Sequence, residues 1–204
     1  MLSNKLLRVI IIFTLVSLLV SCSEKKEKIP ILDLENKVQV LDVVKKYFNK
    51  DTQVAFSGMF DETGKRFILA GWEINNNDEW GIKFAFIEQS GNDFITKYET
   101  DLLDGSFKES LADKIKFSSF DYDLVYYNSQ GYFMGSGGGE VISYIVDFEN
   151  KQVYYAHFVA ETETTANLFI SDNTINKELV NFFTATFKKD YPSLKIVEDD
   201  IIVE

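Results

Sequence analysis

The spacing of apolar residues predicts two amphipathic helices, one toward each end of the chain. Over residues 36–49, apolar side chains recur at the spacing of one helical face, and they are Val40, Leu41, Val44, Tyr47 and Phe48. A second helix is predicted over residues 174–190, with the shared face Ile175, Leu179, Phe182, Phe183 and Phe187. Asp172 and Asn173 precede this helix as N-cap candidates, and Tyr191-Pro192 follows it as a stop signal.

Elsewhere the apolar period changes to two, which is typical of β-strands. The strand-like runs are 52–60, 66–74, 80–88, 94–100, 124–128, 141–148, 152–160, 166–170 and 194–203. Most are joined by short turns such as 75–78 and 149–151, so sequential strands are expected to be antiparallel neighbours. The segment 105–115 fits one short helix.

Several runs are apolar on both faces, which indicates strands that are covered on both sides of a sheet. In the run 66–74, Ile68, Ala70 and Trp72 alternate with Phe67 and Leu69. The two helices are the obvious covers. We therefore predict an α+β fold in which an antiparallel β-meander sheet is packed by an N-terminal and a C-terminal amphipathic helix. The alternative is a β-sandwich or barrel with helices at its ends.

The first residues have the pattern of an export signal. Lys5 and Arg8 precede an apolar run over residues 9–20, which is shorter than the roughly 20 residues needed to span a bilayer. The run ends in Leu19-Val20-Ser21-Cys22, which resembles the lipobox of bacterial lipoproteins. An ordinary secretory leader followed by a chance cysteine is the alternative.

The resemblance implies a division of the chain into three parts. Residues 1–21 would be a removed signal peptide, residues 22–30 a lipidated Cys22 with a flexible tether, and residues 31–204 a single globular domain. It also implies attachment to a lipid bilayer through acylated Cys22, in the bacterial cell envelope. Ser23 is not aspartate, and the sorting rule carried by the resemblance then favours the outer membrane.

Composition narrows the classes of function. The formal net charge is −11, with 32 acidic and 21 basic residues, and the basic residues are scattered among the acids. A nucleic-acid-binding protein needs a clustered basic face, so that class is excluded. The acidity would suit a cationic partner, although a solubilising surface is the simpler interpretation. Cys22 is the only cysteine, so its lipidation would exclude disulfides and thiol chemistry.

The glycine-rich segment 135–139 stands out locally. It lacks the Gly-Lys-Ser/Thr ending of a phosphate-binding loop, and Glu140 follows it. A flexible linker is the favoured interpretation, and a ligand-contacting loop is the alternative. Aromatic side chains lie nearby in the sequence, and an exposed subset of them would make a binding platform. The predicted binding surface comprises Tyr126, Tyr127, Tyr132, Gly137, Gly138 and Gly139.

No catalytic residue, metal site or cofactor is predicted. His157 is the only histidine and shares a strand face with Val153, Tyr155 and Val159, so a packed histidine is expected. The acidic pairs Asp121/Asp123, Glu161/Glu163 and Asp199/Asp200 do not fit a calcium loop and are expected in solvated positions.

These observations predict a lipid-anchored, non-enzymatic binding or interaction domain. Its partner would be another envelope protein or a secreted protein. One alternative is a periplasmic hydrolase that uses two carboxylates, as glycoside hydrolases do. Another is an immunity-type lipoprotein that protects the envelope from a toxin.

Overall fold

The chain folds into two β-sheets, each associated with one helix. The structure is a computed structural model, and it describes residues 28–76, 78–107, 112–129, 139–160 and 162–198. The helices are α2 (Lys37–Tyr47) and α3 (Lys177–Asp190). The strands are β1 (Val54–Gly58), β2 (Phe67–Asn75), β3 (Trp80–Ser90), β4 (Asp93–Glu99), β5 (Ala112–Ile115), β6 (Leu124–Ser129), β7 (Gly139–Asp147), β8 (Gln152–Ala160), β9 (Thr165–Ile170) and β10 (Lys195–Glu198). The predicted α+β class is confirmed.

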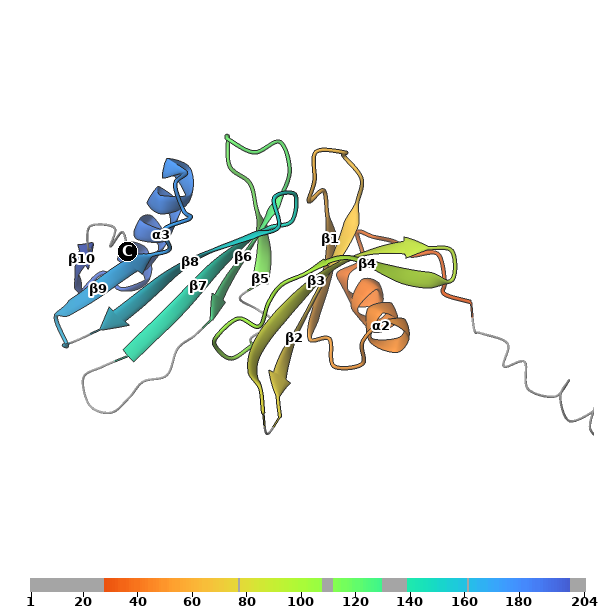
Figure 1. Cartoon of the computed structure of the whole chain (residues 1–204), viewed down its shortest axis with the longest axis horizontal. Helices are drawn as coiled ribbons and strands as arrows, with labels where there is room; N and C mark the ends of the chain where they lie inside the picture. Colours follow the sequence, from red (N-terminus) through yellow and green to blue (C-terminus); the bar gives the residue numbers. More distant parts are fainter. Residues whose placement is uncertain (1–27, 77, 108–111, 130–138, 161, 199–204) are drawn as a thin grey trace, which may run out of the picture.

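The strands divide between the sheets in chain order. The first sheet has the order β1-β2-β3-β4, and the second has the order β10-β9-β8-β7-β6-β5. All neighbours are antiparallel except β10, which runs parallel to β9 because α3 lies between them in the chain. The prediction of one meander sheet is wrong. The first four strands and the next five form separate meanders, and the segment between β4 and β5 carries the chain from one to the other (Figure 1).

One core cluster joins the two sheets. Phe56, Phe84 and Phe86 of the first sheet share it with Tyr127 and Val146 of the second. Aromatic rings meet across the interface, since the Phe86 and Phe148 rings stack at 4.8 Å between centroids and the Phe84 and Tyr127 rings lie 5.5 Å apart. The second apolar face of these strands is therefore explained in part by a second sheet. The sequence pattern alone does not show whether a helix or another sheet covers an apolar face.

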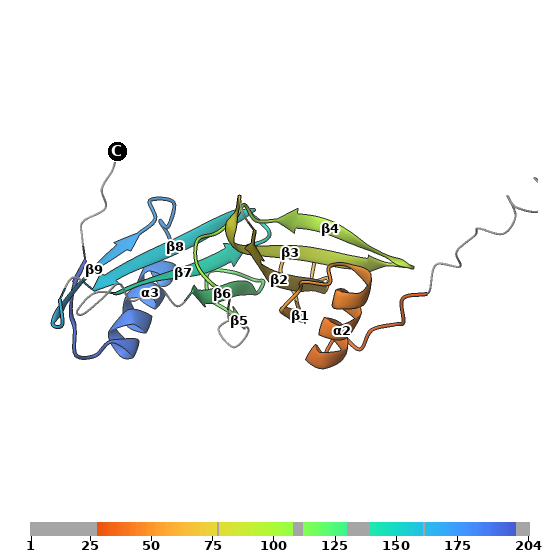
Figure 2. The same ribbon diagram turned by 90° about the horizontal axis from the view of Figure 1, so that it is seen from below.

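The helices cover the remaining faces. Val40 and Val44 of α2 are fully buried in a cluster with Ile68 and Ala85 of the first sheet. Leu179, Phe183 and Phe187 of α3 are fully buried in a cluster with strands of the second sheet. The two views place α2 and α3 toward opposite ends of the molecule's long axis (Figures 1 and 2).

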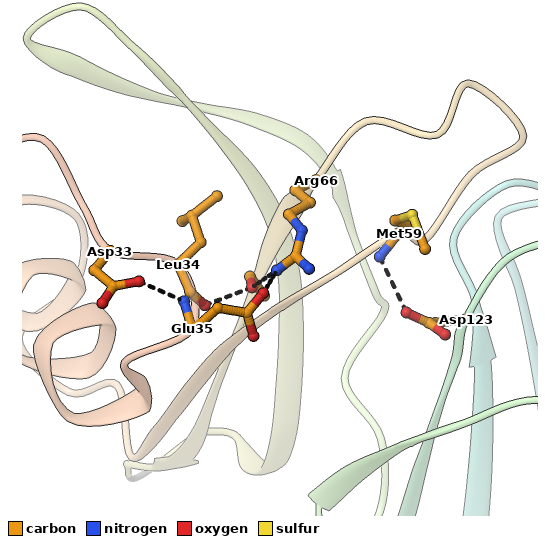
Figure 3. Close-up of polar contacts among 7 residues, drawn as sticks. Asp33, Leu34, Glu35, Met59, Arg66 and Asp123 are labelled. Carbon is orange, nitrogen blue, oxygen red and sulfur yellow. Dashed lines mark hydrogen bonds and ion pairs between the residues drawn. The ribbon is translucent and has the colours of Figure 1, made fainter.

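Two hydrogen bonds between Met59 and Asp123 also connect the two sheets. The Asp123 N–H donates to the Met59 carbonyl at 2.6 Å, and the Met59 N–H donates to the Asp123 carboxylate at 3.1 Å (Figure 3). Arg66 forms an ion pair with Glu35 in the segment that precedes α2 (Figure 3). These contacts fix loops at the ends of the first sheet.

The helix ends differ from prediction in one case. Asn36 caps α2 by accepting a hydrogen bond from the Gln39 N–H. The N-cap of α3 is Asn176, which accepts from Glu178, and neither Asp172 nor Asn173. Ile175 consequently precedes the helix and is 88% exposed, so its assignment to the apolar face is wrong. The predicted short helix at 105–115 is also wrong for its described residues, because Ala112–Ile115 pairs with β6 as strand β5.

Candidate functional site

A cleft of about 560 Å³ opens at the margin of the core between the sheets. This volume lies within the roughly 300–1,000 Å³ that small-molecule pockets occupy. One wall comes from the start of β3 and from the segment after β4, and the other comes from β6, β7 and β8. The lining residues are Trp80, Leu102, Leu103, Asp104, Gly105, Ser129, Glu140, Ile142, Tyr144, Tyr155 and His157.

The register of the second sheet explains which side chains meet there. Ser129 of β6 lies opposite Ile142 of β7, and Ile142 lies opposite His157 of β8. Tyr144 likewise lies opposite Tyr155. Directly paired residues project from the same face of a sheet, so all of these side chains line one surface.

Glu140 and His157 are in direct contact within the cleft. His157 Nε2 and Glu140 Oε2 lie 2.9 Å apart, and the two side chains are 31% and 39% exposed. Glu140 is diagonal to His157 across the β7–β8 ladder, a separation that long side chains can bridge. His157 shares its strand face with Tyr155, as predicted, but it is only half-buried and pairs with a carboxylate at the cleft.

Ser129 provides a buried hydroxyl at the inner end of the same wall. Its residue is fully buried, and its Oγ has no hydrogen-bond partner among the described residues. Gly105 faces it closely, because a Cβ built on Gly105 would lie 1.8 Å from Ser129 Oγ. A buried hydroxyl without a partner costs free energy, so it is the kind of group that a ligand can satisfy.

These groups do not form a nucleophile–base pair. Ser129 and His157 are separated by strand β7, which places their Cα atoms about 10 Å apart at the usual strand spacing. A serine nucleophile needs its base within hydrogen-bond reach. No group of three or more His, Cys, Asp or Glu side chains that could hold a metal ion occurs in the described part of the chain.

Tyr144 links the two walls of the cleft. Its hydroxyl donates to the backbone carbonyl of Asp104 at 2.9 Å. Burial, and next the negative charge of Asp104, raise the pKa of Tyr144 above its ordinary value. Both effects disfavour the charged phenolate, so the Tyr144 hydroxyl stays protonated at physiological pH.

The predicted binding surface is placed differently by the structure. Tyr127 is fully buried, donates to the Ser106 carbonyl at 2.6 Å and stacks on Phe107. Tyr126 projects from the opposite face of β6, where its ring lies 5.0 Å from that of Phe182. These two rings therefore do not form an exposed platform. Gly139 is the first residue of β7, whereas Tyr132, Gly137 and Gly138 lie outside the described residues.

None of the described members of the predicted acidic pairs lines the cleft. Asp123 connects the sheets through Met59, and Glu163 is exposed. Glu161, Asp199 and Asp200 lie outside the described residues, as does Cys22. In the part of the chain that the structure describes, no helix is long and apolar enough to cross a membrane.

Sequence reasoning missed the Glu140–His157 contact and the roles of Trp80 and Ser129. A signal for the first existed, because a hairpin folded about the turn 149–151 places Glu140 diagonal to His157. No sequence signal marks Ser129 or Trp80, since both depend on how the two sheets pack.

Comparison with known proteins gives no family assignment. No protein-family model matches the chain, and no curated protein and no solved structure is significantly similar to it.

Proposed function

We propose that the chain is a lipid-anchored lipoprotein of the bacterial cell envelope, sorted to the outer membrane, whose folded domain binds a ligand or partner without catalysing a reaction. The observation that carries the binding role is the cleft between the sheets. It combines a ring at Tyr155 that is 44% exposed with a buried hydroxyl at Ser129 that has no hydrogen-bond partner in the described part of the chain. Such a mixture of apolar surface and a few polar groups is typical of binding pockets.

The arrangement of the cleft supports binding over catalysis. Its serine and histidine are two strands apart, which places them beyond hydrogen-bond reach of each other. A carboxylate-dependent hydrolase requires two acids that flank the scissile bond. Of the acidic pairs that suggested such an enzyme from sequence, the described members Asp121, Asp123 and Glu163 lie away from the cleft, whose two acids are Asp104 and Glu140.

The anchor is supported by the leader pattern and tested by substitution of Cys22. Full-length wild-type protein is expected in the membrane fraction with an acylated mass, because several acyl chains give stable attachment. Cys22→Ser is expected to lose the acyl mass and to be released without detergent. Ser23→Ala, which keeps the cysteine, serves as the control and should remain in the membrane. An unmodified, freely soluble wild-type protein would contradict the proposal.

The binding role is tested by capture from envelope extracts. Wild-type protein and Ile95→Ala, which truncates an exposed apolar side chain on β4, should retain the same bound material. Tyr155→Ala should lose it, because this ring is the exposed aromatic surface of the cleft. Equal retention by all three proteins would show that the cleft is not the binding site.

A further inference from the structure

The charge of the cleft restricts what it can hold. Its lining contains the acids Asp104 and Glu140, with His157 Nε2 at 2.9 Å from Glu140 Oε2, and none of the described lining residues is a lysine or an arginine. The whole chain has a formal net charge of −11, which raises the concentration of cations near its surface and lowers that of anions. Phosphates and carboxylates are therefore unsuitable ligands.

The aromatic residues favour the same sign of charge. Trp80, Tyr144 and Tyr155 line the cleft, and aromatic faces attract cations through their quadrupoles. Tyr155 is 44% exposed, whereas Tyr144 is 5% exposed and forms part of the wall. An organic cation would contact apolar surface and negative charge at once.

Ser129 specifies a further property of the ligand. Its hydroxyl is buried, lines the cleft and has no partner among the described residues. It can accept a hydrogen bond from an N–H group or donate one. A primary ammonium carries three N–H donors, so it can donate to a hydroxyl and to a carboxylate at the same time. A quaternary ammonium has no N–H group and can donate to neither.

We propose that the cleft binds a small organic molecule that carries a primary ammonium group. This inference rests on the proposed binding function and names its ligand class. The ammonium group is held between the carboxylate of Glu140 and the hydroxyl of Ser129, and the carbon chain lies against Tyr155 and Trp80. Gly105 lies directly against Ser129, because a Cβ there would collide with Ser129 Oγ at 1.8 Å.

The test is calorimetric titration of the full chain in detergent with three probes of equal carbon-chain length. Cadaverine carries ammonium ends, pentanediol carries hydroxyl ends and glutarate carries carboxylate ends. Cadaverine should bind saturably at one site, and the other two should bind at least about tenfold more weakly, because neither satisfies the charge of the cleft. Equal binding of pentanediol, or tighter binding of glutarate, would overturn the inference.

Variants locate the binding site. Glu140→Gln, Tyr155→Ala and Ser129→Ala should each weaken cadaverine binding by about fivefold to tenfold. Glu88→Gln is the matched control, since Glu88 also pairs with a basic side chain, Lys97, but does not line the cleft. An unchanged affinity in all three cleft variants would overturn the inference.

The same variants separate this inference from the proposed function. If cadaverine does not bind but Tyr155→Ala abolishes capture from envelope extracts, the cleft is a binding site and the ammonium class is wrong. If a neutral disaccharide such as cellobiose binds in place of cadaverine and is lost in Tyr155→Ala, the ligand is a glycan and the ammonium class is again wrong. If neither probe binds and capture is unchanged, both proposals fail.

Discussion

One face of the second sheet meets two different environments. Where the first sheet covers it, the face carries apolar or aromatic residues such as Tyr127 and Val146, which are almost completely buried. Further along β7 and β8, beyond this cover, the same face carries Glu140 and His157, both about one-third exposed. Side-chain alternation along the strands is the same in both regions. The cover, and not the strand pattern, decides which part becomes core and which becomes cleft.

Truncation in the covered region should have the largest effect. Phe86 is fully buried, and its ring lies 4.8 Å from Phe148 and 5.0 Å from Phe60. Phe86→Ala is expected to lower the free energy of unfolding by about 3–5 kcal/mol, because it removes apolar contacts and leaves a cavity. Urea unfolding followed by fluorescence measures this. Ile95→Ala, at an exposed position of β4, should change it by less than about 0.5 kcal/mol.

The boundary between core and cleft is expected to be the next most sensitive position. Gly105 has φ +117°, and an added Cβ would meet Ser129 Oγ at 1.8 Å. Gly105→Ala should therefore lower the free energy of unfolding by about 2–3 kcal/mol through backbone strain and displacement of Ser129. Gly64→Ala is the matched control, because φ there is +70° but no atom lies within 4 Å of the added Cβ. A cost equal to that of Gly64→Ala would mean that the close approach to Ser129 has no energetic effect.

Alkaline pH should lower the free energy of unfolding through Tyr144, which lies where the covered region and the cleft meet. Burial, followed by the charge of Asp104, raises the pKa of Tyr144, so the folded protein keeps this phenol protonated where the unfolded chain loses the proton. Stability is then unaffected below about pH 10 and falls above it, by about 1.4 kcal/mol per pH unit for one such tyrosine. Urea unfolding at several pH values should show a shallower decline for Tyr144→Phe. Equal slopes would contradict this assignment.

The two regions differ in how much of their structure could be predicted from the sequence. The helices, most strands and the shared face of Tyr155 and His157 follow from local periodicity, so they could be predicted. The division into two sheets could not, because a strand with two apolar faces fits a helix cover or a sheet cover equally well. The cleft depends on that division. Tyr127 was consequently predicted to be exposed, although it fills the core between the sheets.

The smallest expected effect on stability has the opposite sign and distinguishes the cleft from the core most sharply. Ser129→Ala removes a buried hydroxyl that has no hydrogen-bond partner among the described residues, so it should raise the free energy of unfolding by about 1 kcal/mol. The same substitution should weaken ligand binding, because the hydroxyl is then absent from the cleft. Thermal unfolding and cadaverine titration of one variant measure both quantities. A gain in stability together with a loss of affinity is what a preformed binding group gives, whereas a loss of stability would show that Ser129 supports the fold.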